Sequence, residues 1–419
     1  MAEQRTYHDP LHGAIRLCRD EPAEALAIAL IDTPPFQRLR RIRQLGPAYL
    51  TFHGAESSRF THSLGVLHLA RLALTHLERF SPELKQWRPL LYAAALLHDV
   101  GHGPLSHSGE EMFGLRHETW SGRLIREHGD LREPLECCQP GLATAVADLL
   151  EHGRHPNQVM LALVSSQLDC DRLDYLLRDS YSTGTRYGVL DLERLLDSLT
   201  LAPDGSVAIH PKGLMAAEHY LVVRQLMYRT VYNHRLNVVC NWLLQQVVVV
   251  ARRLGPRAVE ADAVMARWLW QLDHLDLESY LANDDLRTGY HLLRWREEGP
   301  AELAELCARL LDRRLPQATD VSDCTLEQRL QLLAEAQRLS DRQGLGWDRC
   351  CALQQRRSRG YDPYHGGLRL WDGERLQALE HRSTLVQALA TPLDKTWLIH
   401  PREVTAALRR SLAALSQAP

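Results

Sequence analysis

The order of hydrophobic and polar positions along this chain predicts a mainly helical protein. Residues 91–97 are apolar or aromatic throughout and carry no charge, a pattern typical of a buried helix. Gly101, Gly103 and Pro104 follow closely and predict that this helix ends just past residue 99. The rest of the chain is organised around this stretch.

Apolar residues at helical spacing predict further helices along most of the chain. They are expected over residues 24–30, 36–45, 59 onward, 117–163, 168–179, 213–250, 256 onward including 303–339, and from 402 to the end. The segment 36–45 is expected to form an amphipathic basic helix, with Phe36, Leu39 and Ile42 on one face. On the helix 168–179, polar side chains four residues apart share one face.

Only short stretches show a strand pattern. Alternating apolar residues around Pro203-Asp204-Gly205 predict a β-hairpin over residues 199–210. Less regular structure is expected elsewhere: a turn and short strand over 5–17, loops over 46–58 and 359–367, and an alternating run over 368–373. The predicted fold class is mainly α, with a small β-hairpin, a smaller mixed α/β C-terminal region and no internal repeats.

The composition is that of an ordinary globular protein. The chain has 419 residues, of which 45% are hydrophobic and 24% charged, enough for one large domain or two to three smaller ones. A formal net charge of −3 argues against nucleic acid as the main partner.

The cysteines and the apolar runs predict the setting of the protein. The nine cysteines are odd in number and form no CxxC motif, so neither a zinc ribbon nor a disulfide framework is expected. The N-terminus lacks an apolar signal core, and no apolar run reaches membrane-spanning length. A cytoplasmic protein with reduced thiols and no membrane partner is predicted.

Four residues in three separate segments form a candidate metal set: His62, the adjacent pair His98 and Asp99, and Asp171. An imidazole and a carboxylate at the end of a buried helix are costly unless something binds them, and a metal ion satisfies both. Gaps of 36 and 72 residues mean that only the tertiary fold can unite the set. These ligand types suit one divalent ion such as Mn, Fe or Mg, and metal-assisted phosphoester hydrolysis.

Further polar residues have side chains suited to acid-base chemistry or to phosphate binding. They are His102, His107, His117, Arg59, Arg172, Arg224 and Arg235. Taken singly and without the metal set, each arginine is better explained as a surface charge. A lone His-Asp pair would likewise be a helix cap beside a solvated acid, but two more histidines within nine residues favour the chemical interpretation.

An ordered series of short motifs resembles a known family. The series is Asp9-Pro-Leu-His-Gly, Ile31-Asp-Thr-Pro-Pro-Phe-Gln-Arg-Leu-Arg, Gln44-Leu-Gly, Arg59-Phe-Thr-His-Ser-Leu-Gly, His98-Asp-Val-Gly-His-Gly-Pro-Leu-Ser-His and Asp171-Arg-Leu-Asp-Tyr-Leu-Leu-Arg-Asp. It resembles the HD-domain superfamily, and within it the deoxynucleoside triphosphate triphosphohydrolases, which include an animal enzyme with SAM and HD domains and the bacterial dGTPases. The resemblance spans residues 5–250. It implies an HD-domain phosphohydrolase core over 1–250, with a helical and mixed C-terminal region continuous with it over 251–419.

The resemblance implies a role for each matched position. The metal ligands would be His62, His98, Asp99 and Asp171. The catalytic histidines would be His107, which protonates the leaving 5′ oxygen, with His102 and His117 beside it. Phosphate contacts would come from Arg59, Arg224 and Arg172, the last in place of a usual lysine. The pocket for the deoxyribose would be formed by Gln44, Leu45, Tyr175, Asp179 and Tyr232.

A second nucleotide site is one of two interpretations of an N-terminal string. Asp32, Gln37 and Arg40 match residues that recognise an activating guanine nucleotide at a subunit interface in the animal enzyme. The same string occurs in relatives where it can serve structure alone, and His8 replaces an asparagine common before Asp-Pro. GTP or dGTP activation therefore stays open, and a homo-oligomer is expected from the family.

The main hypothesis is a metal-dependent dNTP triphosphohydrolase. In the implied reaction a metal-activated water attacks the α-phosphorus and releases a deoxynucleoside and tripolyphosphate. One alternative is an HD phosphohydrolase for a nucleoside monophosphate or cyclic nucleotide, against which the sugar-pocket residues and Arg59 argue. Another is a nucleotide-sensing binding protein, against which the complete ligand set and His107 argue.

Overall fold

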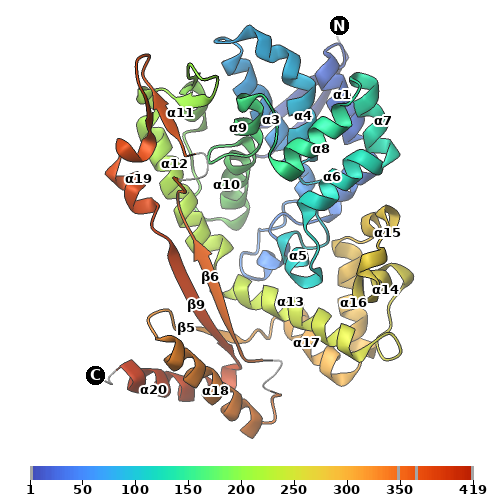
Figure 1. Cartoon of the computed structure of the whole chain (residues 1–419). Helices are drawn as coiled ribbons and strands as arrows, with labels where there is room; N and C mark the ends of the chain where they lie inside the picture. Colours follow the sequence, from blue (N-terminus) through green and yellow to red (C-terminus); the bar gives the residue numbers. More distant parts are fainter. Residues whose placement is uncertain (1–2, 347–349, 364–366, 417–419) are drawn as a thin grey trace.

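The computed structural model describes residues 3–346, 350–363 and 367–416 and confirms a mainly helical fold, with 60% helix and 11% strand (Figure 1). The helices are α1 (Pro22–Ile31), α2 (Pro34–Gln37), α3 (Arg59–Leu77), α4 (Arg88–Leu97), α5 (His107–Phe113), α6 (His117–Glu127), α7 (Gly129–Cys138), α8 (Leu142–His152), α9 (Gln158–Val164), α10 (Cys170–Thr183), α11 (Leu192–Asp197), α12 (Leu214–Met227), α13 (Arg235–Leu254), α14 (Ala263–Trp270), α15 (Leu277–Leu281), α16 (Asp285–Glu298), α17 (Ala301–Leu311), α18 (Leu326–Arg342), α19 (Thr384–Leu389) and α20 (Thr405–Ser416).

The strands are short and form three small sheets. They are β1 (Gln4–Asp9), β2 (Gly13–Cys18), β3 (Leu199–Leu201), β4 (Val207–Ile209), β5 (Gln317–Asp320), β6 (Ala352–Ser358), β7 (Arg369–Trp371), β8 (Leu376–Ala378) and β9 (Leu393–His400). The sheet orders are β1-β2, β3-β4-β7-β8 and β5-β9-β6, and every pairing is antiparallel except β4 with β7.

The helix predicted over residues 91–97 is confirmed and lies in the main hydrophobic core. All side chains of α4 from Leu90 to Leu97 are buried, between α1, α3 and α8. The same core reaches the C-terminal region, because Tyr361 and Leu370 are buried in it. The helix ends at His98, so its polar successors are delivered to the inside of the protein rather than to its surface.

The predicted β-hairpin over 199–210 is also confirmed, with Leu199 paired to Ile209. The N-terminal segment 5–17 contains a complete two-stranded hairpin, whereas the sequence indicated a turn and one strand. Strand β5 interrupts the region 303–339 that was expected to be helical throughout. Within the predicted loop 359–367, residues 364–366 lie outside the described residues.

The expectation of a regular amphipathic helix over 36–45 is wrong. After α2 the chain forms a 3-10 turn over Arg38–Arg41 and then an extended stretch, in which Arg43 pairs with Ser58. The side chain of Arg38 is buried and donates to the carbonyls of His102 and Asn283. These tertiary bonds replace the helical ones, and they could not be seen in the local pattern of polar residues.

The expectation of one long helix over 213–250 is wrong as well. Helix α12 passes into a π-helical turn at Tyr228–Tyr232, and α13 begins at Arg235 with His234 as its N-cap. A π turn inside a helical run is typical of a functional site. Here it directs Tyr232 toward Asp179 of α10, whose carboxylate accepts the tyrosine hydroxyl at 2.9 Å.

The structure also bears on the cysteines, on membrane-spanning helices and on the expected domain boundary. All nine cysteines lie in the described part of the chain and are free thiols. In that part no helix is long and apolar enough to cross a bilayer. The boundary expected near residue 250 falls inside α13, which packs on α5 and on α17 (Figure 1).

Candidate active site

Three helices bring the candidate metal set together. His62 comes from α3, His98 follows the last turn of α4, and Asp171 lies in the first turn of α10. The two histidine Nε2 atoms are 3.2 Å apart, and Asp171 Oδ1 lies 3.0 Å from His62 Nε2 and 3.7 Å from His98 Nε2. One ligand atom from each residue lies within 4.8 Å of the others, a spacing that suits a shared cation.

Asp99 lies beside this trio with a second partner. Its Oδ2 is 3.6 Å from His62 Nε2 and its Oδ1 is 3.4 Å from His98 Nε2. Oδ2 also accepts a hydrogen bond from Arg59 Nη1 at 2.6 Å. Burial raises the pKa of Asp99, but the charges of Arg59 and the histidines outweigh burial and hold this pKa well below its usual range. Asp99 is therefore an ionised carboxylate able to serve as a fourth ligand.

The other ring nitrogens of both histidines are already engaged. Nδ1 of His62 lies 2.8 Å from Asp174 Oδ2, and Nδ1 of His98 lies 2.9 Å from the carbonyl of Ala95. Such partners fix the tautomer of a metal-binding imidazole and leave Nε2 free for the ion. Two Nε2 atoms and carboxylate oxygens that face one another have the donor chemistry of a divalent cation site.

The pKa values of the candidate metal set also favour a bound cation. Burial lowers the pKa of His62, but hydrogen bonds to Asp171 and Asp174 outweigh it and raise the pKa to about 10. Burial raises the pKa of Asp171, yet His62 and His98 outweigh it and hold the pKa well below its usual range. The carboxylates thus favour a positive charge between the three side chains. A divalent cation can supply that charge in place of a protonated histidine.

Asp174 contacts the candidate metal set, although the sequence analysis did not select it. It is fully buried, and besides His62 it contacts His12 Nε2 at 2.6 Å and Arg178 Nε at 2.7 Å. A Cβ at Gly65 would lie 1.9 Å from Asp174 Oδ1, so the glycine is needed for α3 to approach α10 this closely. Its position three residues after Asp171 on a helix was the available indication.

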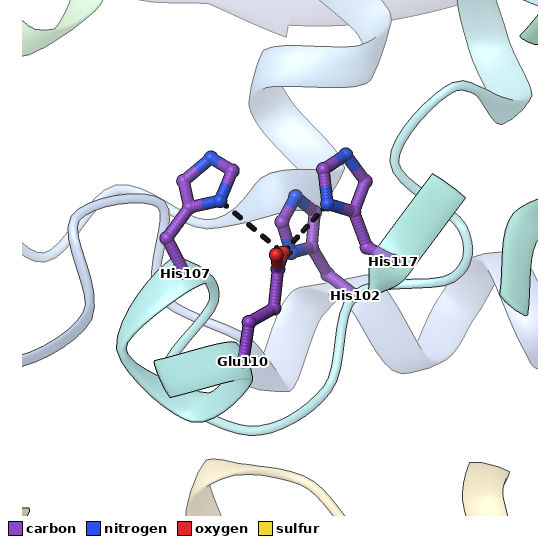
Figure 2. A group of neighbouring side chains, drawn as sticks. All are labelled: His102, His107, Glu110 and His117. Carbon is purple, nitrogen blue, oxygen red and sulfur yellow. Dashed lines mark hydrogen bonds and ion pairs between the residues drawn. The ribbon is translucent and has the colours of Figure 1, made fainter. Parts of the chain in front are cut away.

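A second cluster unites the three predicted catalytic histidines around an unpredicted acid, Glu110 (Figure 2). One oxygen of Glu110 lies 2.6 Å from Nδ1 of His117, 3.2 Å from Nδ1 of His107 and 3.3 Å from Nδ1 of His102. Burial raises the pKa of Glu110, but the bonds from His107 and His117 outweigh it and hold the pKa well below the usual range. Glu110 therefore stays ionised and orients His107 and His117, while His102 lies beside them at ion-pair distance. Its place one helical turn after His107 could have indicated this.

The three histidines differ in exposure. His107 has 66% of its side chain exposed, whereas His102 is fully buried and stacks on His117 with ring centroids 3.9 Å apart. Burial and the Arg59 guanidinium lower the pKa of His102 well below its usual value. His107 is thus the most accessible member of the cluster, whereas His102 is buried beneath it.

One cavity of about 490 Å³ joins both clusters to the predicted sugar and phosphate residues. Its lining includes Gln44, Leu45, Arg59, His98, Asp99, His107, His117, Asp171, Arg172, Tyr175, Asp179 and Tyr232. A ligand of nucleotide size fits a pocket in this range. The tertiary fold therefore brings most of the predicted site residues to one concave surface.

Several predicted residues do not line this cavity. His62 and His102 are buried behind its wall, and Arg224 is buried with Nη1 bonded to Gln167 at 2.7 Å. Arg235 is exposed at the first residue of α13. Asp32, Gln37 and Arg40 lie away from it, where Asp32 pairs with Arg5 and Gln37 accepts from Arg40 at 2.8 Å.

The arginines of the cavity are held by protein groups. Arg59 is buried and donates to Asp99, to Ser106 Oγ at 2.9 Å and to the carbonyl of Gln44 at 3.2 Å. Arg172 pairs with the buried carboxylate of Asp169, and its Nε is a buried donor without a partner in the described part of the chain. Arg172 is the cation best prepared to bind a phosphate oxygen.

Asp179 and Tyr232 form a polar corner of the cavity. Burial raises the pKa of Asp179 to about 7, against the opposing hydrogen bond from Tyr232. Oδ1 of Asp179 is buried and lacks a hydrogen-bond partner among the described residues. Tyr175 packs edge-on against Tyr232, with centroids 5.8 Å apart. The corner therefore offers a free acceptor, Asp179 Oδ1, beside two aromatic rings. A sugar could donate a hydroxyl to this acceptor and pack its ring against the aromatic side chains.

Comparison with known proteins agrees with this geometry. Residues 59–179 match the HD domain and residues 190–298 match the HD associated region. The chain is 38% identical to the uncharacterized protein YwfO of Bacillus subtilis over 317 residues, which cover 75% of this chain and 72% of YwfO. It is 34% identical over 228 residues to the deoxynucleoside triphosphate triphosphohydrolase SAMHD1 of Danio rerio, covering 46% of this chain and 36% of that protein.

Solved structures show the same likeness. The crystal structure of the phosphohydrolase BT4208 from Bacteroides thetaiotaomicron superposes with a TM-score of 0.82 at 26% identity, covering 96% of this chain and all of that one. Fold and site together define a metal-dependent phosphohydrolase of the HD type. The chain belongs to the HD-domain superfamily: an HD domain is followed by an HD associated region, and SAMHD1 proteins are among its relatives.

Proposed function

We propose that this protein hydrolyses deoxynucleoside triphosphates at the α-phosphorus, releasing a deoxynucleoside and tripolyphosphate. The observation that carries the proposal is the single cavity in which the metal set, an oriented histidine, a free arginine donor and the Asp179–Tyr232 corner meet. The names of the SAMHD1 relatives support the same substrate class. The proposal covers the substrate and the products, whereas the phosphohydrolase class follows from the family.

The metal set would hold one divalent ion through His62, His98, Asp99 and Asp171. When bound, this ion supplies Lewis acidity to a water and to the α-phosphate. Around it, Arg172 would bind the phosphate chain through its free Nε–H. Water oxygen bonds to phosphorus as the bond to the 5′ oxygen breaks, and His107 gives that oxygen its proton from Nε2, while Glu110 holds Nδ1.

The test is product analysis. The protein, loaded with Mn²⁺ and separately with Mg²⁺, is incubated with each dNTP and each NTP, and the products are separated by ion-exchange chromatography. Deoxynucleoside with tripolyphosphate in equal amounts is expected. Release of pyrophosphate or phosphate, or turnover of nucleoside monophosphates or cyclic nucleotides alone, would overturn the proposal in favour of another HD phosphohydrolase.

The same assay decides whether a guanine nucleotide activates. Asp32 and Arg40 are exposed; Gln37 accepts from Arg40 and donates to the carbonyl of Ile31, the residue before Asp32. A set of this kind on one surface supports an activator site that a second copy of the chain would complete. We expect added GTP or dGTP to raise the rate on another dNTP and the mass to shift to an oligomer in light scattering. Identical rates and a constant mass would reject the activator site.

Leu45→Gly is expected to weaken the preference for deoxynucleotides. Leu45 lines the cavity next to Gln44, and its side chain would occupy the space needed by a 2′-hydroxyl. One apolar contact is worth about 10- to 200-fold in discrimination. The ratio of kcat/KM for dATP over ATP should fall by about that factor. The control is Leu45→Ile, which keeps the volume; a glycine variant as selective as the unmodified protein would remove Leu45 from the pocket wall.

Asp179→Asn is expected to stabilise the protein in a pH-dependent way while weakening dNTP binding. The folded pKa of Asp179, about 7, exceeds the unfolded value, so stability due to the protonated acid is complete below about pH 4 and is lost as pH rises to 7. Asparagine mimics the protonated form at every pH. Thermal melts should show a gain at pH 8, at most about 4 kcal/mol, that shrinks toward pH 4.

The binding readout separates this effect from a general one. Asparagine offers the sugar hydroxyl a weaker acceptor than a carboxylate, so the KM for a dNTP should rise at pH 8. A stability gain of equal size at both pH values would show that folding does not raise the pKa of Asp179.

A further inference from the structure

Hydrogen bonds with residues of the HD associated region hold the loop that carries His102 and His107. Leu105 N–H donates to Asp285 Oδ1 at 2.7 Å across 180 residues of sequence. The hydroxyl of Tyr280 donates to the carbonyl of Gly101, 179 residues away. Both partners lie within 280–285, the segment from the end of α15 to the start of α16. This short segment therefore contacts the histidine loop at two points.

Arg38 adds a third connection between the same two segments. Its Nη1 donates to the carbonyl of His102 at 2.7 Å, and its Nη2 donates to the carbonyl of Asn283 at 2.6 Å. Arg38 and Asn283 are both buried. The guanidinium thus acts as a bridge between the two segments, although it belongs to the stretch 36–45 that was expected to form a basic amphipathic helix.

The loop needs such support because its backbone is strained. Leu105 and Ser106 both have positive φ, 61° and 56°, and neither is glycine. Side chains with a Cβ disfavour this region, and strained residues persist only where surrounding contacts hold them. The strain falls directly before His107, so this turn sets where α5 begins and where its first side chain points.

Asp285 is the best-placed group to hold the turn. It is buried, and its two oxygens accept separate backbone donors: Oδ1 from Leu105 and Oδ2 from Arg43 at 3.0 Å. Ser106 Oγ in turn donates to the carbonyl of Arg43 at 2.6 Å. The carboxylate therefore ties the turn at Leu105 to the neighbouring extended stretch at Arg43. A side chain with a single acceptor could not satisfy both backbone donors.

We propose that Asp285 is a positioning residue that holds the strained turn at Leu105 and Ser106 and so places His107 for proton donation. It does not touch the substrate and acts only through the loop. The proposal rests on the proposed function, since it assigns to Asp285 the placement of the proton donor. It gives the HD associated region a defined catalytic contribution.

The test compares Asp285→Asn with Asp284→Asn on two substrates. Asp284 is the matched control, since it lies one residue away, caps α16 and pairs with Arg41 at 2.5 Å. The substrates are a dNTP, whose 5′ oxygen needs a proton to leave, and p-nitrophenyl triphosphate, whose nitrophenolate leaves without one. Melting temperature and bound metal are measured for each variant to show that it is folded and loaded.

With the dNTP, Asp285→Asn should lower kcat by about 10- to 100-fold, the scale for groups that orient a functional side chain, with little change in KM. With the nitrophenyl substrate its rate should match that of the unmodified protein within about twofold, and Asp284→Asn should change neither. An equal loss on both substrates, or no loss on the dNTP, would overturn the role of Asp285. Failure of the unmodified protein to release tripolyphosphate would instead reject the proposed function.

Discussion

His98→Ala is expected to abolish both metal binding and hydrolysis. His98 Nε2 faces the ligand atoms of His62 and Asp171, and its Nδ1 contacts a backbone carbonyl, so alanine removes one imidazole nitrogen from the predicted metal set. Hydrolysis should fall by at least about 1,000-fold, because Lewis-acid stabilisation is worth several kcal/mol and each 1.4 kcal/mol is about tenfold. Metal content is measured by mass spectrometry on the purified protein.

His98 is a cleaner target than its neighbour. Asp99→Ala should be inactive too, but it also strips the carboxylate from the buried guanidinium of Arg59. Leaving a buried charge unpaired costs about 3–5 kcal/mol, so this variant should melt earlier as well. His76→Ala is the control, because His76 lies on α3 with His62, and its ring nitrogens contact the carbonyl of Leu199 and the carboxylate of Asp197. Retained metal and turnover in His98→Ala would refute the assignment of the metal set.

His107→Ala should leave metal content unchanged while lowering kcat. The loss expected for a general acid is about 10²- to 10⁴-fold. Because His107 is mostly exposed, the variant should fold normally. Unchanged kcat in a metal-loaded variant would remove His107 from the mechanism.

Glu110→Gln tests the orientation of the same histidine. A glutamine can offer one acceptor oxygen but not the negative charge that faces the Nδ1 atoms of all three histidines (Figure 2). We expect a fall in kcat smaller than that of His107→Ala, and no further fall when both changes are combined, because the two residues act as a unit. Glu111→Gln is the matched control, since Glu111 faces Gln245 and Arg356 instead.

Much of the site could be predicted from the sequence because its motifs are local. The buried run 91–97 places His98 and Asp99 at the end of a core helix, and the structure shows that helix in the core. The roles of the candidate ligands remain predictions, although the fold brings them within contact distance. Where the local pattern misled, tertiary bonds were the cause: Arg38 turns inward to two carbonyls, and a π turn breaks the long helix so that Tyr232 reaches Asp179.

By itself the sequence determined the helical class, the buried helix before His98 and the chemical types of the candidate ligands, because periodicity and residue type are properties of short segments. Only the tertiary structure decided which acids complete the site. Glu110, Asp174 and Asp285 act through partners that other elements supply, and a carboxylate reveals such a role only when its neighbours are in place. The contribution of the HD associated region is of this second kind, since hydrogen bonds across 180 residues leave no local pattern.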